Sequence, residues 1–144
     1  MDSEEKDQIR KLKILIADDN ELLRNVLTAI IKRFSKEILY AETGVEAVAV
    51  YRNNPDIDLI LMDFYMPNMN GYEASKLIRL LNSEVIIFIQ TAFTNSDEIK
   101  ESMGAEVNDY FDKPYNKTLF NQLIKKHFNN ENNKDSYHKK LISN

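Results

Sequence analysis

Short runs of aliphatic residues alternate along the chain with longer segments in which apolar residues recur at helical spacing. The first, third and fourth of these runs are apolar almost throughout, which is typical of parallel strands covered by helices on both faces. The pattern therefore predicts five strands, at residues 13–17, 37–42, 58–62, 85–90 and 109–111.

The segments between the strands predict helices. Two of them carry an apolar stripe with the i, i+3, i+4 spacing of one helix face. The first stripe consists of Leu23, Val26, Leu27, Ile30, Ile31 and Phe34, and the second of Leu119, Leu123, Ile124 and Phe128.

Two more helices are predicted from local signals. Thr43 with Glu46 predicts a capping box that opens a helix, which we expect to end near Tyr51, before the breaking segment NNPDID. A further helix is predicted over residues 71–81, with Tyr72, Leu77, Ile78 and Leu81 as its apolar residues.

Strand and helix alternating in series predict an α/β domain with a parallel sheet, right-handed crossovers and helices on both faces. We expect this domain to span residues 13–128, after an N-terminal extension at 1–12. Residues 129–144 are rich in asparagine and lysine and poor in apolar groups, so we expect a polar, disordered tail.

Composition excludes several classes of function. The chain has 144 residues, enough for one domain, and no cysteine, so disulfides and thiolate sites are excluded. No apolar stretch approaches the ~20 residues of a membrane span, and the charged N-terminus lacks a signal sequence; we expect a soluble, cytoplasmic protein without a membrane segment. The net charge of −4 comes without a basic stripe, so we expect no direct binding to nucleic acid.

Polar residues follow the predicted strands at their carboxyl ends, where ligands bind in open parallel sheets. Strand one leads into Asp18 and Asp19, strand three into Asp63, strand four into Thr91 and strand five into Lys113. If the strand order is 2-1-3-4-5, strands one and three are neighbours, and their ends bring the three aspartates together.

Three carboxylates at one place would repel one another unless a cation lies among them. Oxygen ligands at a shallow site suit Mg²⁺, which takes only one or two carboxylates from the protein and keeps several waters. A carboxylate at such a site can also attack phosphorus and form an aspartyl phosphate, with Lys113 and Thr91 stabilising the developing charge.

The motifs ADDNE, LILMDFYMPNMNGYE, IQTA and DYFDKP resemble the receiver domain of two-component response regulators, over about residues 13–128. The resemblance implies a flavodoxin-like (βα)5 three-layer sandwich with strand order 2-1-3-4-5. It also implies that Asp63 accepts a phosphoryl group, with Mg²⁺, from a histidine kinase or a histidine phosphotransfer domain.

The resemblance implies a role for each residue that matches the motifs. Asp19 would bind Mg²⁺ directly and Asp18 through water, while Asp63 would be both ligand and nucleophile. The main-chain carbonyl of Tyr65 would complete the metal ligands. Thr91 would form a hydrogen bond with the phosphoryl group, and Lys113, which precedes a cis Pro114 peptide, would form an ion pair with it. Tyr110 would be the aromatic switch, whose ring turns inward as Thr91 moves toward the phosphoryl group.

Three further expectations follow from the resemblance. Phosphorylation would change the face formed by residues 95–104, the strand at 109–111 and the last helix, and could drive homodimerisation there. Tyr65 and Phe93 are bulkier than the usual residues at their positions, so we expect them to slow the loss of the phosphoryl group by hydrolysis. His127 and His138 are expected to be solvated and not to act as phosphodonors.

Other functions remain open on the sequence alone. A phosphohydrolase of the haloacid dehalogenase type also uses aspartyl phosphate and Mg²⁺, but it requires a D-x-D motif and a cap insertion. A receiver-like module that binds partners without phosphate is the second alternative. The motif sequences are also similar to those of the receivers in hybrid histidine kinases. The sequence therefore leaves open both a stand-alone regulator and a fragment of a hybrid kinase. If the chain is a receiver, its chemistry is self-phosphorylation and slow self-dephosphorylation rather than metabolic turnover.

Overall fold

A parallel sheet organises the chain in the computed structural model, which describes residues 11–90, 101, 104–112 and 115–129. The sheet order is the expected 2-1-3-4-5, and its neighbouring strands all pair in parallel. The strands are β1 (Leu12–Ala17), β2 (Ser35–Ala41), β3 (Leu59–Asp63), β4 (Ile86–Gln90) and β5 (Asp109–Phe111).

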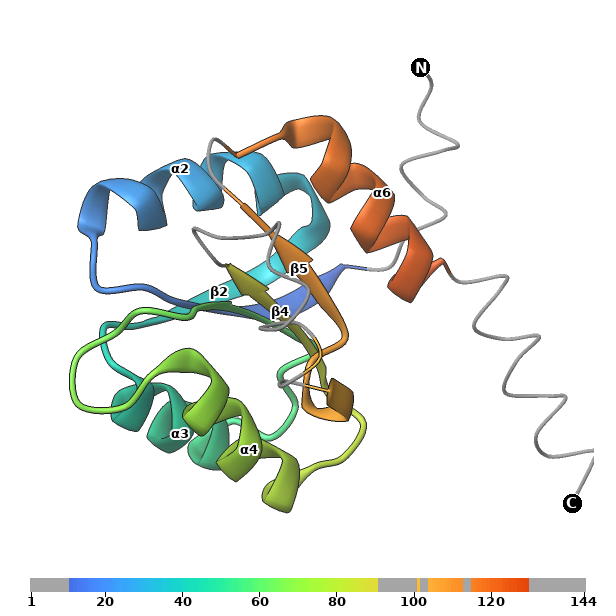
Figure 1. Ribbon diagram of the computed structural model, residues 1–144. Coiled ribbons are helices and arrows are strands. Elements are labelled where there is room, and N and C mark those ends of the chain that lie inside the picture. Colours follow the sequence, from blue (N-terminus) through green and yellow to red (C-terminus); the bar gives the residue numbers. More distant parts are fainter. Residues whose placement is uncertain (1–10, 91–100, 102–103, 113–114, 130–144) are drawn as a thin grey trace, which may run out of the picture.

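Helices cover both faces of this sheet, which confirms the three-layer arrangement (Figure 1). On one face lie α2 (Glu21–Ile31), which continues into the 3-10 turn η1 (Lys32–Phe34), and α6 (Lys117–Phe128). On the other face lie α3 (Gly44–Asn53) and α4 (Gly71–Leu81). A second 3-10 turn, η2 (Gly104–Glu106), precedes β5.

The observed elements differ from the predicted ones mainly at their ends. β5 and α4 have the predicted bounds, whereas β2 begins two residues earlier than expected and α3 ends two residues later. β1 begins at Leu12, one residue before the expected start of the domain. Residues 1–10 and 130–144, which hold most of the expected extension and tail as well as His138, lie outside the described residues.

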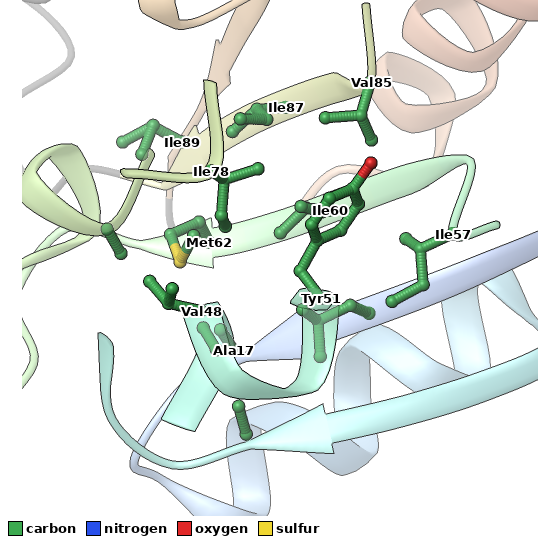
Figure 2. Close-up of a cluster of buried hydrophobic side chains, with 14 of the residues drawn as sticks. Ala17, Val48, Tyr51, Ile57, Ile60, Met62, Ile78, Val85, Ile87 and Ile89 are labelled. Atoms are coloured by element: carbon green, nitrogen blue, oxygen red, sulfur yellow. The ribbon is translucent and has the colours of Figure 1, made fainter. Parts of the chain in front are cut away.

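Side chains of alternating strand residues pack into two separate cores, one on each face of the sheet. Leu12, Ile14 and Ile16 of β1 join the core beneath α2 and α6, while Leu15 and Ala17 join the core beneath α3 and α4. Figure 2 shows the second core, in which side chains of β1, β3 and β4 meet those of the two helices. Because side chains on a strand alternate between faces, a strand apolar on both sides needs both layers.

The predicted apolar faces of two helices are only partly buried. In α2, Leu27 and Ile31 are buried, but Val26 of the predicted stripe is exposed and so is Leu22. In α4, Ile78 is buried beside Ala74 and Ser75, whereas Leu77, Leu80 and Leu81 are exposed. Spacing identifies a helical face, but the width of that face which the sheet covers depends on tertiary packing.

The expected capping box at the start of α3 is only half formed. The Thr43 hydroxyl accepts a hydrogen bond from the Glu46 amide at 3.0 Å, but the Glu46 carboxylate accepts from the amide of Glu42 at 3.3 Å rather than from that of Thr43. A complete capping box occurs instead at α4, between Asn70 and Glu73. Asparagine serves as well as threonine at this position, because its side-chain oxygen accepts the same backbone hydrogen bond.

The amino edge of the sheet is closed by a polar network around Lys13. Its backbone amide donates to the Asp58 carboxylate at 2.9 Å, and its ammonium group lies 2.9 Å from a carboxylate oxygen of Asp56. The Asp58 amide in turn donates to the Lys13 carbonyl at 2.8 Å. These acidic residues are therefore paired with the start of β1.

The expectation that His127 is solvated is wrong. Its Nε2 atom hydrogen-bonds the Asp109 carboxylate at 3.0 Å, and its ring centroid lies 5.2 Å from that of Phe88. His127 follows Leu123 by four residues and Ile124 by three, so it extends the buried stripe of α6 despite its lysine neighbours. The Asp109 carboxylate also accepts a hydrogen bond from Lys126 at 3.1 Å, so it joins α6 to β5.

No helix in the described part of the chain is long and apolar enough to cross a membrane.

We predict that Asp109→Asn lowers the free energy of unfolding at neutral pH by no more than about 1 kcal/mol, because solvent screens ion pairs near the surface. Burial would raise the pKa of the Asp109 carboxyl, but hydrogen bonds from His127 and Lys126 hold that pKa below its usual value of 3.8. A carboxyl with a depressed pKa stabilises the fold above its ordinary pKa and loses that contribution as the pH falls.

The difference between parent and variant should therefore persist above pH 3.8 and shrink below it, as measured by urea unfolding across this range. Glu84→Gln, at an exposed carboxylate, serves as the control. A difference that grows as the pH falls would contradict the assignment.

Candidate functional site

Strand register brings three polar side chains to one place at the carboxyl edge of the sheet. Ala17 pairs with Met62, so Asp18 and Asp63 follow on neighbouring strands, and Asp63 pairs with Gln90 of β4. Each of the three lies two residues beyond a side chain of the core beneath α2 and α6. They therefore share that face of the sheet, since side chains two residues apart on a strand point the same way.

Carboxylate oxygens of Asp18, Asp19 and Asp63 all lie within 4.8 Å of one another. Asp18 is buried, Asp63 is 8% exposed and Asp19 is exposed, so the cluster opens to solvent on the Asp19 side. The structure thus brings together the three aspartates that the sequence analysis singled out.

Several hydrogen bonds hold the acidic turn after β1 in place. The Asp18 amide donates to the Ala41 carbonyl of β2 at 3.0 Å, and one Asp18 carboxylate oxygen accepts from the Asn20 amide at 2.9 Å. Asn20 then caps α2 by accepting from Leu23. Arg24 donates to the Asp18 carbonyl at 2.7 Å and lies 3.4 Å from Glu42, so it ties the turn to the end of β2.

The segment after Asp63 is held as firmly. The Phe64 amide donates to the Gln90 carbonyl at 2.9 Å, and the Tyr65 amide donates to the Asp63 carboxylate at 3.2 Å. Gly71, at the start of α4, packs so closely on this segment that an added Cβ would lie 2.3 Å from the Asp63 carbonyl oxygen. Only glycine allows this approach, which fixes the helix against the backbone of Asp63.

The remaining predicted site residues are placed only in part. Tyr65 is 50% exposed beside the cluster, with its ring in edge contact with Phe64. Tyr110 lies half-buried against the core beneath α3 and α4; burial and the charge of Asp109 raise the pKa of its hydroxyl. Thr91 and Lys113, with Phe93 and Pro114, lie outside the described residues.

Sequence reasoning missed two polar side chains beside the aspartates. The Tyr115 hydroxyl donates a hydrogen bond to Oε1 of Gln90 at 2.7 Å. Burial, followed by the negative charges of Asp18 and Asp63, raises the pKa of this hydroxyl well above its usual value, so it stays protonated. One signal was present in the sequence: Gln90 is the polar end of an otherwise apolar strand.

The acidic cluster has the chemistry of a site for a hard divalent cation. Its donors are carboxylate oxygens alone, clustered at a rim open to solvent, so a cation there could keep water ligands. This combination fits Mg²⁺, which favours a few carboxylates and several waters over a closed protein cage.

The fold and the site define a class of protein: an α/β domain with an acidic cluster at the carboxyl ends of its parallel strands. Residues 14–125 match the family model of the response regulator receiver domain. The chain belongs to this family and is a receiver domain of two-component systems. Family membership decides against the phosphohydrolase of the haloacid dehalogenase type.

Individual proteins agree with this assignment. The chain is 33% identical over 105 residues to a chemotaxis protein CheY of Halobacterium salinarum, an alignment that spans 73% of this chain and 87% of the relative. The receiver domain of the sensor histidine kinase PA1611 from Pseudomonas aeruginosa, solved with magnesium in its active site cleft, is 25% identical with a TM-score of 0.72, covering 81% of this chain and 97% of that one.

A third similar protein is the receiver domain of Ssk1 from Saccharomyces cerevisiae, solved in complex with the histidine phosphotransfer protein Ypd1. It is 27% identical with a TM-score of 0.74, and the similarity covers 83% of this chain and 90% of that one.

Proposed function

We propose that this receiver takes a phosphoryl group from a phosphohistidine of a partner protein onto Asp63, with Mg²⁺ held by Asp18, Asp19, Asp63 and the Tyr65 carbonyl. The observation that carries the proposal is the approach of three carboxylates to within 4.8 Å, in a chain of the receiver family. We propose further that it acts in the cytoplasm.

The described residues suit this transfer. In the step itself, the bond between phosphorus and the donor imidazole breaks, its electron pair returns to the imidazole, and a carboxylate oxygen of Asp63 bonds to phosphorus. Bound Mg²⁺ would offset the negative charge of the phosphoryl oxygens and the carboxylates. The hydrogen bond from the Tyr65 amide and the packing of Gly71 hold Asp63 at the strand end, so little reorganisation is required.

The roles of Thr91 and Lys113, as hydrogen-bond donor and cation to the phosphoryl group, stay part of the proposal. So do the switch role of Tyr110, homodimerisation on phosphorylation, and a place at the end of a hybrid kinase.

We predict that incubation with Mg²⁺ and acetyl phosphate adds one phosphoryl group to the chain, measured by intact mass. The mass increase should disappear in Asp63→Asn and when Mg²⁺ is chelated, and should fall strongly in Asp19→Asn, because each change removes the nucleophile or a metal ligand.

Asp56→Asn is the matched control, since Asp56 lies at the opposite edge of the sheet and pairs with Lys13. Uptake that is unaffected by Asp63→Asn, or that continues without a divalent cation, would disprove the proposal.

Exposed apolar side chains beside the acidic cluster support a protein as the phosphodonor. Leu22, in the first turn of α2, is 70% exposed, and Val26 is exposed one turn further along the same helix. A partner that brings its histidine to Asp63 must cover this rim. A few residues near the centre of such a contact, where water is excluded, contribute most of the binding free energy.

We predict that Leu22→Glu slows phosphorylation by a protein donor about 10-fold or more, because it places a charge in the interface. The donor should be a phosphorylated histidine phosphotransfer protein that labels the parent chain. Transfer from acetyl phosphate should stay unchanged, because this donor needs no docking surface.

Leu80→Glu changes a leucine that is 83% exposed on α4 and is the matched control. Equal rates for the two variants with the protein donor would argue against a docking role for α2.

We propose that Tyr65 shields a phosphoryl group on Asp63 from water. Its ring lies in edge contact with that of Phe64, with centroids 4.8 Å apart, two residues after Asp63. We predict that Tyr65→Asn shortens the lifetime of the phosphorylated chain at least about 3-fold, because water is excluded less well. This lifetime is measured by following the decay of the phosphorylated mass after acetyl phosphate is removed. Tyr40→Asn, at an exposed tyrosine of β2, is the control; an unchanged lifetime in Tyr65→Asn would refute the role.

A further inference from the structure

A part-buried hydrogen bond lies at the end of β4, on the residue that pairs with Asp63. The Tyr115 hydroxyl donates to Oε1 of Gln90 at 2.7 Å, and Gln90 is 2% exposed at the end of a strand that is otherwise apolar. Burying an amide costs free energy unless it is hydrogen-bonded. Packing of β4 would be served equally well by an aliphatic residue, so the Gln90 side chain calls for another explanation.

Gln90 is linked to Asp63 in two ways. The two residues pair across β3 and β4, with their side chains on the same face of the sheet. The main-chain carbonyl of Gln90 also accepts the hydrogen bond of the Phe64 amide, the first amide after Asp63. The position of Gln90 thus determines where β3 ends and where the Asp63 carboxylate lies.

Tyr115 supplies a rigid support for this strand end. Its ring packs at 5.9 Å from that of Phe111 in β5 and at 6.4 Å from that of Phe120 in α6. Burial, followed by the negative charges of Asp18 and Asp63, raises the pKa of its hydroxyl, so it stays protonated and donates the hydrogen bond. The hydrogen bond to Gln90 therefore connects the segment between β5 and α6 with β4, the strand whose Gln90 pairs with Asp63.

We propose that Gln90 and Tyr115 are positioning residues, whose hydrogen bond holds the Asp63 carboxylate in place for phosphoryl transfer. The inference rests on the proposed function of Asp63 and adds two residues that touch neither the donor nor phosphorus. This role would explain why the Gln90 amide is buried at the strand end, because reaction rates depend steeply on the placement of the reacting atoms.

The test compares phosphorylation rates at saturating Mg²⁺ and acetyl phosphate. Tyr115→Phe removes the hydroxyl but keeps the ring packing, and Gln90→Met removes the amide at similar volume. Each single variant should be slowed roughly 3- to 10-fold, the effect of one lost neutral hydrogen bond. The double variant should be slowed no more than the slower single variant, because both changes remove the same contact.

The matched control is Tyr51→Phe in the opposite core (Figure 2). The Tyr51 hydroxyl accepts a hydrogen bond from Asn82 at 2.8 Å and its side chain is fully buried. This variant should lose stability without a change in the phosphorylation rate. Thermal unfolding of all variants separates lost stability from lost positioning.

Single variants that are phosphorylated at the parent rate, or slowing that multiplies in the double variant, would overturn the inference. A parent chain that takes up no phosphoryl group would instead overturn the proposed function. In that case, Mg²⁺ titration by calorimetry tests the positioning by itself: misplacing Asp63 should weaken binding about 3-fold or more in both single variants. Unchanged affinity would then overturn the inference as well.

Discussion

The approach of three carboxylates at the ends of two neighbouring parallel strands is the constraint on which the rest of this structure depends. Negative charges held within 4.8 Å repel one another, so the fold must hold them there by other contacts. Backbone amides donate to Asp18 and Asp63, and the Arg24 guanidinium binds the Asp18 carbonyl. The acidic cluster is therefore assembled in advance, and the cation and phosphoryl group that we propose would meet it without large rearrangement of these three residues.

The two edges of the sheet show why acidic residues alone do not define a site. At the amino edge, Asp56 and Asp58 pair with the ammonium group and the amide of Lys13, so their charges serve the start of β1. At the carboxyl edge, Asp19 is exposed and joins the two other aspartates. The amino edge is thus closed by ion pairing, whereas the carboxyl edge gathers three carboxylates at a rim where Asp19 is exposed.

The helices around the sheet have a buried side, which packs on the sheet that carries the aspartates, and an exposed side. The core beneath α2 and α6 carries Phe111, Phe120 and Tyr115, whose rings pack against one another. On the outer side of α2, Leu22 and Val26 remain exposed beside the same site. The core beneath α3 and α4 anchors the helix that begins against Asp63, through the close approach of Gly71. Support therefore comes from the two cores, and the exposed side of α2 is the surface that we propose for a partner.

The sequence by itself determined the class of fold and the aspartates of the cluster, because apolar periodicity and residues at strand ends are local properties of the chain. It predicted the bounds of α4 and β5 for the same reason. The strand order was predicted only through the resemblance of the motifs to receiver domains, and the pairing of the strands confirms it. Tertiary structure alone decided which face of each helix is covered: it exposed Val26 and Leu77 and packed His127 against Phe88. It also decided that the Tyr115 hydroxyl meets Gln90, since the two residues are 25 positions apart and only the pairing of β4 with β5 brings them together.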